Sequence, residues 1–412
     1  GGESLPEETP QGDQFEEYVE WAVPNLIEVT DETLARFNQM LAERGFDFGL
    51  RLNVLEYSLL DNSVYQDQLL KASSDIAFAG LGSSEGADLP LQLISSGFFD
   101  SLDSYLPGSD LYAAVPEQMW NSVRYEGSVY TIPTGAATDG GICIYFDLDK
   151  ISREAAESFQ GDVTKLPELL GEDGKLLYSE GQFSYVSYYG GTYWNGVVVT
   201  QEGEVSSVFD HEGCMEWLRV MNQLYLSGRA VDDERADWSI LIDNSPTEKE
   251  NVYCYSTKDI LNTRYAGSTG IVSASEKKEK AFRLLELLHT DSELGNCLIY
   301  GADYREKDGY AVDAEGNVMS GDLRKIVFGL NESVLWDQLS AVSIKYNSIQ
   351  DKLDYFAGNV LESPVIGMTF ETDTVPIKQI LSMTVEDSLW KSRDLEGLFF
   401  LCTFSFFRAL NL

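Results

Sequence analysis

Histidine is scarce in this chain, and the motifs of common catalytic sites are missing. The 412 residues include 2 histidines, His211 and His289, and no HExxH, GxSxG or Walker sequence. His289 ends a helical pattern, where a capping role is favoured over a catalytic one. The glycines of GLGSSEG at 80–86 are spaced one residue too widely for a dinucleotide-binding loop. We therefore predict no enzyme, no catalytic residue, no cofactor and no metal site.

Basic residues are also few. The sequence has 29 Lys and Arg against 68 Asp and Glu, which gives a formal net charge of -39. This charge repels phosphate backbones and anionic membrane surfaces, so we exclude nucleic-acid binding and predict a neutral solute as the ligand. Carboxylate pairs occur throughout so acidic a chain, and most are expected to be solvated surface groups. Their number alone does not reject a glycosidase site.

Cysteines and long apolar runs are the next absences. The five cysteines lie far apart with no C-x-x-C motif, so most are expected to be small buried residues, and the odd number leaves at least one unpaired. No apolar run in the first 390 residues is long enough to span a bilayer. The apolar tail from Leu395 is interrupted by Thr403, Ser405 and Arg408. We expect a buried helix there rather than a membrane anchor.

The first 29 residues have the composition of a flexible acidic linker. They begin Gly-Gly without Met and contain Pro6, Pro10 and Gly12 before any hydrophobic periodicity appears. This start suggests a processed N-terminus from which a signal segment has been removed. We therefore expect residues 1–29 to be a linker.

Hydrophobic periodicity then predicts alternating helices and strands. Helical spacing covers 30–43 and 65–72, and strand patterns cover 50–54 and 75–79. This alternation favours a parallel sheet with crossover helices. From about residue 140 to 264 aromatic residues and Gly pairs dominate, and at 270 the first pattern returns. Two lobes, one of them built from separated segments, are therefore expected, with a hairpin over 303–321.

Several stretches carry a family resemblance. In order they are DIAFAG at 75–80, SSGFFDSLDSYL at 95–106, MWNSVRYEGSVYTIPTGAATDGGICIYFDLDKI at 119–151 and GIVSASEKKEKAFRLLELLHTD at 270–291. Together they resemble the extracellular solute-binding proteins of ABC importers, in particular the sugar-binding group that includes maltose-binding protein. LIYGADYREKDGYAVDAEGNV at 298–318 and SPVIGMTF at 363–370 resemble a Gram-positive lipoprotein subgroup.

The resemblance implies a periplasmic-binding-protein-like α/β fold with two lobes, a ligand cleft and three hinge crossings. The expected N-terminal lobe comprises 30–137 with 268–329, and the expected C-terminal lobe 138–267 with 330–412. Such a protein captures a carbohydrate, an oligosaccharide first of all, by lobe closure. Its implied partner is the transmembrane permease of an ABC importer. It would be a monomeric, extracytoplasmic, cell-surface lipoprotein, held to the membrane only by a lipid anchor outside this chain.

Ligand-binding residues are expected in the loops that follow the strands, where aromatic rings pack on sugar faces and polar groups bond the hydroxyls. In the first lobe these candidates are Glu56, Tyr57, Gly80, Ser83 and Asp139. In the second lobe they are Tyr188, Tyr193, Trp194, Asn195, Trp238, Tyr255, Arg264 and Trp336. Tyr193 and Trp194 are favoured because they follow Gly190 and Gly191 in a loop-like context. Trp120, Trp217 and Trp390 lie in helical patterns and are assigned to the core.

Two alternatives remain open at this point. The same fold could bind a peptide, an amino acid or another polar solute, and a less favoured possibility is a glycan-active enzyme. A ring-rich site favours sugar over peptide.

Overall fold

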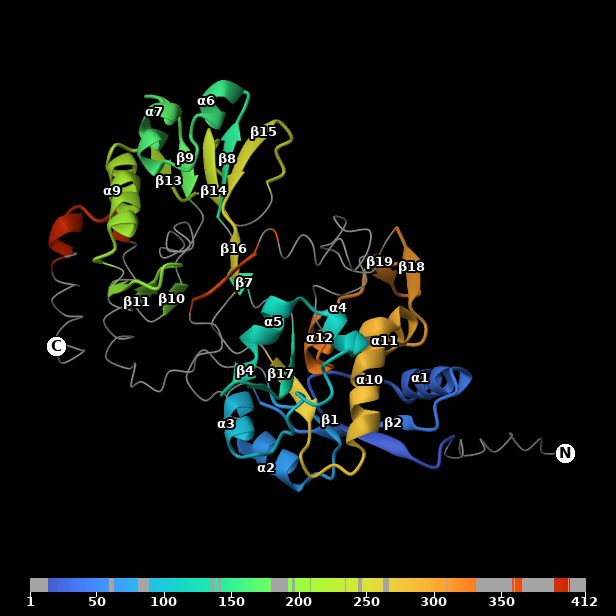
Figure 1. Cartoon of the computed structure of the whole chain (residues 1–412). Helices are drawn as coiled ribbons and strands as arrows, with labels where there is room; N and C mark the ends of the chain where they lie inside the picture. The colour runs from blue at the N-terminus through green and yellow to red at the C-terminus, as the bar shows by residue number, and fades with distance from the viewer. Residues whose placement is uncertain are drawn as a thin grey trace. The chain divides into compact units, whose positions relative to one another are not determined.

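The computed structural model describes residues 14–58, 63–80, 89–134, 138–139, 142–178, 192–194, 197–207, 209–233, 235–243, 247–261, 267–308, 310–330, 358, 360–364, 389–398 and 400 (Figure 1). The chain forms two compact units. Unit 1 comprises Gly1–Ala137 and Arg264–Gly358, and unit 2 comprises Thr138–Thr263 and Asn359–Leu412. The chain was predicted to pass from one lobe to the other after residues 137, 267 and 329. In the structure it passes from one unit to the other after residues 137, 263 and 358.

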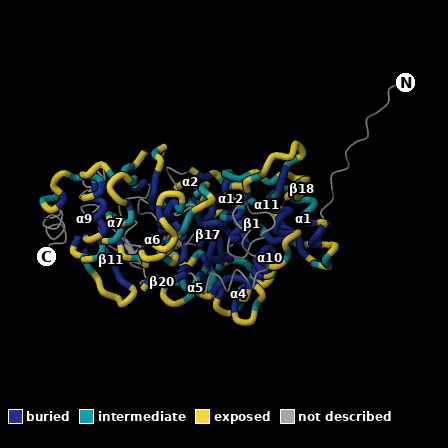
Figure 2. Tube along the Cα trace, turned by 90° about the horizontal axis from the view of Figure 1, so that it is seen from above, coloured by how far each residue is buried: buried dark blue, intermediate teal, exposed yellow. Residues whose placement is uncertain are grey.

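Unit 1 is built on a five-stranded sheet of order β2-β1-β3-β17-β6. Its strands are β1 (Tyr18–Pro24), β2 (Gly49–Leu55), β3 (Ile76–Phe78), β6 (Thr131–Pro133) and β17 (Gly267–Ile271). Strand β1 pairs in parallel with β2 and β3, which confirms the predicted parallel pairing for this part of the sheet. Strand β17 is antiparallel to both β3 and β6, so the returning segment lies beside elements far from it in sequence. Figure 2 shows the buried positions running through β1 and β17.

Strand β1 corrects the prediction that residues 1–29 are a flexible linker. Val19, Trp21 and Ala22 are 0% exposed, and the strand pairs on both sides in the sheet. The linker prediction was wrong here because Glu16, Glu17 and Glu20 dilute a short apolar run. A strand covered on both faces need not alternate apolar and polar residues.

The helices of unit 1 follow their sequence signals. Thr30 caps α1 (Asp31–Glu43) by accepting a hydrogen bond from the N–H of Thr33, as the predicted helix over 30–43 requires. Asn38 of α1 then exchanges two hydrogen bonds with the backbone of Leu50 in β2, at 3.0 and 2.7 Å. The other helices are α2 (Ser63–Lys71), α3 (Leu89–Ser95), α4 (Asp110–Ala114), α5 (Glu117–Ser122), α10 (Lys278–Thr290), α11 (Ser292–Tyr300) and α12 (Asp322–Val327).

Two hairpins complete unit 1. The first joins β4 (Arg124–Tyr125) to β5 (Ser128–Val129), and the second joins β18 (Arg305–Lys307) to β19 (Tyr310–Val312). The second confirms the hairpin predicted within 303–321.

Unit 2 is built on a second five-stranded sheet, of order β13-β9-β14-β8-β15. Its strands are β8 (Cys143–Asp147), β9 (Leu176–Tyr178), β13 (Ala230–Val231), β14 (Ile240–Asp243) and β15 (Val252–Ser256). Alternate residues divide between two hydrophobic clusters. Ile144 and Phe146 join the larger cluster with Trp217, whereas Tyr145 joins a smaller one with Trp238. Each strand therefore contributes side chains to both clusters.

The larger cluster packs under the helices of unit 2. These are α6 (Arg153–Glu157), η1 (Val163–Lys165), α7 (Leu166–Leu170), α9 (Glu212–Leu226) and η2 (Leu389–Lys391). Trp390 packs edge-on against Tyr178 and Tyr225, with ring centres 5.3 and 5.2 Å apart. Trp120, Trp217 and Trp390 are 0 to 3% exposed, which confirms their assignment to the core.

Two small sheets also belong to unit 2. One contains β10 (Thr192–Trp194), β11 (Val197–Val199) and β12 (Val205–Ser207) in antiparallel order. The other contains β7 (Thr138–Asp139), β16 (Asp259–Leu261) and β20 (Val360–Glu362). The second sheet brings together three segments widely separated in the sequence.

The cysteines and the tail follow the predictions only in part. Cys214 and Cys297 are buried, which raises their thiol pKa values to about 12 and about 11, but Cys254 is exposed, contrary to expectation. Leu395 is buried in the larger cluster, whereas Phe400 is 73% exposed. Within the described residues, no helix combines the length and the apolar character needed to cross a bilayer.

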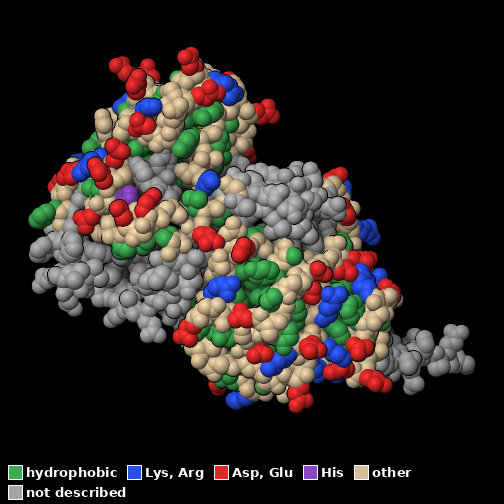
Figure 3. All heavy atoms as spheres, in the orientation of Figure 1, with side chains coloured by type: hydrophobic (Ala, Val, Ile, Leu, Met, Phe, Trp, Pro, Cys, Tyr) green, Lys and Arg blue, Asp and Glu red, His purple; other side chains and the backbone are tan. Residues whose placement is uncertain are grey.

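Charged side chains are common on the surface of the described residues. On the face shown in Figure 3, the Asp and Glu side chains of the described residues are spread widely, with Lys and Arg interspersed among them. Charges arranged in this way do not form a broad basic area on that face.

Candidate functional site

The parallel strands of unit 1 end at one edge of the sheet, and their following residues meet there. Asn25 follows β1, Glu56 and Tyr57 follow β2, and Gly80 lies just beyond β3. The N–H of Asn25 donates to Leu55 O at 2.8 Å, and Asn25 Oδ1 accepts from the N–H of Tyr57 at 2.9 Å. We call Asn25, Glu56, Tyr57 and Gly80 the strand-end site. It unites three residues predicted from the sequence with Asn25, which was missed.

Tyr57 forms the aromatic wall of the strand-end site. Its side chain is 7% exposed and packs edge-on against Tyr65, with ring centres 5.0 Å apart. Tyr65 is fixed in turn, because its hydroxyl donates to Phe78 O at 2.6 Å, and burial raises its pKa above the usual value. Tyr57 therefore rests on a rigid support at the end of β3.

Gly80 faces the Tyr57 ring. Its φ of +108° is a conformation that L side chains rarely adopt. A Cβ placed on Gly80 would lie 3.4 Å from both Cε2 and Oη of Tyr57, an ordinary van der Waals distance. A space of about one carbon atom therefore separates the glycine backbone from the ring.

Glu56 brings an exposed side chain to the strand-end site. Its backbone N–H donates to Gln68 Oε1 of α2 at 2.9 Å, so α2 holds the backbone after β2. With Asn25, which is also exposed, the site combines an exposed carboxylate and amide with a buried phenol and a glycine backbone. These groups bond hydroxyl-rich neutral solutes.

Tyr193 and Trp194, the favoured candidates of the second lobe, lie in a strand rather than the predicted loop. They belong to β10, where Tyr193 pairs with Val198 and Trp194 with Val197. Asp139 lies in β7, paired with Ile260 of β16. For these three residues the structure describes the strand alone. The candidates that lie outside the described residues are Ser83, Tyr188, Asn195, Arg264 and Trp336.

Tyr255 packs into the larger hydrophobic cluster. It is half-buried in β15, and its ring lies edge-on to Phe159 with centres 5.2 Å apart. This packing is typical of a residue at the edge of the hydrophobic core. Its proposed ligand role gains no support from the position of its ring.

Trp238 lies at the opposite end of its strand from the one expected. It precedes β14, so it sits at the amino end of that strand, and the rule that nominated it concerns carboxyl ends. Its side chain is 7% exposed, and Lys249 Nζ lies 4.1 Å from the ring centre. The lysine covers one face of the ring, so that face is not free to pack on a sugar.

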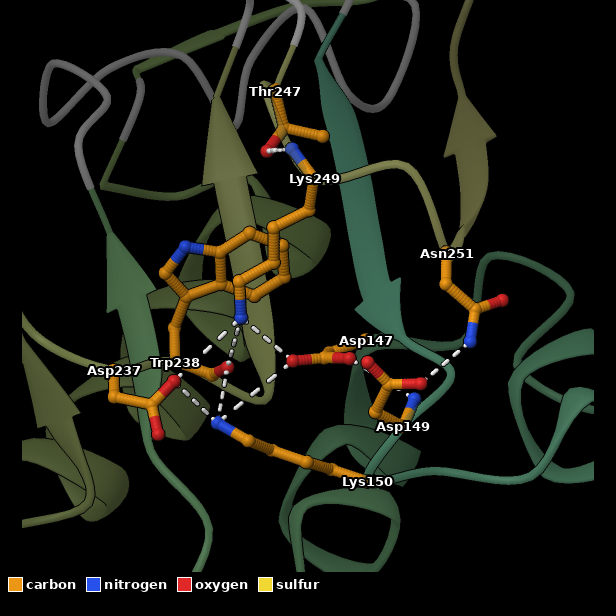
Figure 4. Close-up of polar contacts among 8 residues, drawn as sticks. All are labelled: Asp147, Asp149, Lys150, Asp237, Trp238, Thr247, Lys249 and Asn251. Atoms are coloured by element: carbon orange, nitrogen blue, oxygen red, sulfur yellow. Dashed lines mark hydrogen bonds and ion pairs between the residues drawn. The ribbon is translucent and has the colours of Figure 1, made fainter.

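An ion-pair network surrounds Trp238 (Figure 4). Lys249 Nζ donates to Asp147 Oδ2 at 2.6 Å, and Lys150 Nζ donates to Asp237 Oδ1 at 2.6 Å and to Trp238 O at 2.9 Å. Burial alone would raise the pKa of Asp147, but hydrogen bonds from Lys249 and the Asp149 N–H lower it overall. The network therefore stabilises charged side chains around Trp238.

No group of three or more His, Cys, Asp or Glu in the described part of the chain is placed to hold a metal ion. His289, the more buried of the two histidines, contacts Leu285 O through Nδ1 at 2.7 Å. Burial lowers its pKa to about 4, so it is neutral near pH 7. The favourable positive charge expected at this helix end is therefore absent at neutral pH.

Comparison with known proteins gives the fold. No family model matches the chain, and no curated protein matches it. An N-glycan transport solute binding protein from Streptococcus pneumoniae superposes with a TM-score of 0.57 at 18% identity, covering 96% of this chain and 97% of the other. An extracellular solute-binding protein from Bifidobacterium longum subsp. infantis gives 0.50 at 14% identity, covering 95% of each chain. The fold is that of a solute-binding protein.

This solute-binding-protein fold confirms the predicted fold class, and it confirms the sequence resemblance at the level of the fold. Ligands of open α/β sheets bind outside the carboxyl ends of the strands. In unit 1 that edge carries Asn25, Glu56, Tyr57 and Gly80. We therefore take the strand-end site as the candidate functional site.

Proposed function

We propose that this chain is the substrate-binding component of an ABC importer and captures a carbohydrate, an oligosaccharide first of all, by lobe closure. The observation that carries the proposal is the strand-end site. There an aromatic wall, Tyr57, stands beside the exposed polar residues Asn25 and Glu56 at the ligand-binding edge of a solute-binding-protein fold. Aromatic faces pack on the C–H faces of sugars while amides and carboxylates bond the hydroxyls.

Two further observations support a carbohydrate. The Streptococcus pneumoniae protein with the same fold is named for N-glycan transport. The net charge of -39 disfavours strongly anionic solutes and leaves neutral sugars favoured. In this proposal the chain binds its ligand without covalent chemistry and delivers it to a transmembrane permease. It acts outside the cytoplasm as a monomeric lipoprotein of a Gram-positive cell surface.

The proposed ligand contacts come from both units. In unit 1 they are Asn25, Glu56, Tyr57 and Gly80, with Ser83 from the sequence. In unit 2 Tyr193 and Trp194 remain the favoured rings, because a strand context does not exclude an exposed face. Asp139, Tyr188, Asn195, Arg264 and Trp336 stay as sequence-based proposals. Tyr255 and Trp238 are the weakest, since one packs on Phe159 and the other lies under Lys249.

A thermal-shift screen followed by calorimetry tests the function. The panel contains maltotriose, kestose, chitobiose and a mannosyl N-acetylglucosamine disaccharide, beside a tripeptide and glycine. We expect a sugar to raise the melting temperature, because a ligand that binds only the folded state stabilises it. Stabilisation by the peptide or the amino acid alone would overturn the carbohydrate proposal, and release of reducing ends would identify an enzyme.

Two variants then locate the site. Asn25→Ala removes the acceptor of the Tyr57 N–H and an exposed amide at the strand ends. We expect it to weaken sugar binding about tenfold, the value of one good hydrogen bond to a ligand. Asn251→Ala is the matched control, since Asn251 is exposed and donates to Asp149 Oδ1 in the network around Trp238. Equal affinities of the two variants would place the site elsewhere.

A further inference from the structure

Ser268 lies in β17 directly beside the strand-end site. Its carbonyl oxygen accepts a hydrogen bond from the N–H of Ala79 at 2.5 Å, and Gly80 is the next residue along that strand end. Because β17 runs antiparallel to β3, its first residues lie at the edge where β1, β2 and β3 end. Ser268 is therefore bonded to the residue that precedes Gly80, although the chain separates Ser268 from Gly80 by more than 180 residues.

A bulge changes the regular pairing at this residue. Gly267 pairs with Pro133 and Thr269 with Ile132, so two steps along β17 match one step along β6. Ser268 is the extra residue. Bulges of this kind redirect a side chain out of the strand alternation, and they are frequent next to binding sites.

The Ser268 hydroxyl has no hydrogen-bond partner among the residues that the structure describes, although the residue is 6% exposed. Its neighbour Thr269 differs, because its Oγ1 donates to Val327 O at 2.9 Å. Buried Ser122 is also paired, donating from Oγ to Met119 O at 2.6 Å. A buried hydroxyl without a partner is unfavourable, and in native proteins it calls for a specific reason.

Room for a ligand group near Ser268 lies on the side of Gly80. Gly80 faces the Tyr57 ring across the space of one carbon atom. Gly267, the residue before Ser268, instead packs closely against Thr131, because a Cβ there would lie 2.0 Å from Thr131 Oγ1. Glycines such as Gly80 are used where a ligand approaches a strand closely.

We propose that Ser268 is a further ligand-contacting residue, whose hydroxyl forms a hydrogen bond with a hydroxyl group of the bound carbohydrate. The inference rests on the proposed function and names one contact within it. Among the described residues the hydroxyl has no partner, and in the proposed complex it gains one. Binding therefore breaks no existing hydrogen bond of Ser268, and the new bond contributes to affinity and to the choice among sugars.

Calorimetry on Ser268→Ala tests the proposal, using the tightest binder among maltotriose, kestose, chitobiose and mannosyl N-acetylglucosamine. We expect the Kd to rise about three- to tenfold, the effect of one neutral hydrogen bond. The melting temperature of the free protein stays the same or rises, because an unpaired buried hydroxyl is removed. Ser122→Ala is the matched control: its Kd stays unchanged, and its melting temperature falls because a paired hydroxyl is lost.

A second measurement separates contact from indirect effects. Monodeoxy analogues of the sugar are bound by the parent protein and by Ser268→Ala. We expect one analogue, which lacks the hydroxyl that Ser268 contacts, to bind the parent protein more weakly than the full sugar does. Ser268→Ala should bind this analogue and the full sugar equally well, because the variant has no serine hydroxyl to lose as a partner. A Kd for Ser268→Ala within twofold of the parent overturns the inference and leaves the proposed function standing. Failure of the parent to bind any sugar of the panel overturns both.

Discussion

Lys249 Nζ lies 4.1 Å from the centre of the Trp238 ring and covers one of its faces. The same nitrogen donates to Asp147 Oδ2 at 2.6 Å, so one ammonium group serves both a ring and a carboxylate. The Asp147 side chain is 5% exposed, and a carboxylate so deeply buried needs a paired charge. Lys249 therefore links Asp147, at the end of β8, to Trp238, just before β14.

Replacement of Lys249 is expected to destabilise unit 2. Among the described residues, Lys249→Met leaves Asp147 with one ion pair, to Lys150 at 3.8 Å. We expect the free energy of unfolding to fall by about 1–3 kcal/mol, as for a buried charge that loses a partner. Urea unfolding monitored by tryptophan fluorescence measures this change. Sugar affinity is expected to stay constant, because the network lies at the amino end of β14.

Lys71→Met is the control for this prediction. Lys71 pairs with Asp67 at 3.9 Å, and their side chains are 80% and 75% exposed. Such surface pairs contribute less than about 1 kcal/mol, so the variant is expected to match the parent closely. Equal stability of the two lysine variants would show that the network around Trp238 contributes little.

The sequence predicted the regular helices well because their signals are local. Thr30 caps α1 three residues before its hydrogen-bond partner, and the apolar spacing of 30–43 matches the observed helix. Strand β1 was missed because its environment is not local. Its burial comes from β2 and β3, which follow it in the chain, and the nearby Glu16, Glu17 and Glu20 mask its apolar run. Without β1, Asn25 had no reason to be nominated.

The candidate rings show a similar limit. Trp238 and Tyr57 each follow an acidic residue, Asp237 or Glu56, so their immediate sequence contexts look alike. In the structure the two rings differ in the residues that contact them. Lys249 covers one face of Trp238, whereas Tyr57 lies at the strand-end site beside Gly80. Whether a ring belongs to a core or a site depends on residues that sequence spacing does not bring together.

His289 is expected to make the stability of the free protein depend on pH. Burial lowers its pKa from 6.5 to about 4 in the folded state. Between these values the unfolded chain binds a proton that the folded chain does not, so stability falls as the pH falls through this window. The loss is on the order of 3 kcal/mol, and this group contributes no slope well above pH 6.5.

Paired unfolding curves isolate this effect from that of the many carboxylates. His289→Gln keeps a side-chain N–H that can reach Leu285 O but has no titration in the window. Carboxylates contribute equally to both proteins, so the difference in unfolding free energy between them shrinks or reverses as the pH falls from 7 to 4. A constant difference across that range would contradict the burial of a neutral histidine.

Replacing Gly80 would have two effects: it would strain the backbone and it would fill space in the strand-end site. A pair of glycine variants separates these effects. At Gly80 φ is +108° and at Gly97 it is +75°, so alanine is strained at both positions and each variant is expected to lose about 1 kcal/mol of stability or more. The added methyl group of Gly97→Ala meets no atom within 4 Å, but that of Gly80→Ala lies 3.4 Å from the Tyr57 ring. It therefore fills the space that we assign to the ligand, and Gly80→Ala alone is expected to lose sugar affinity. Calorimetry on the folded variants measures this, and unchanged binding by Gly80→Ala would mean that the ligand does not approach this backbone.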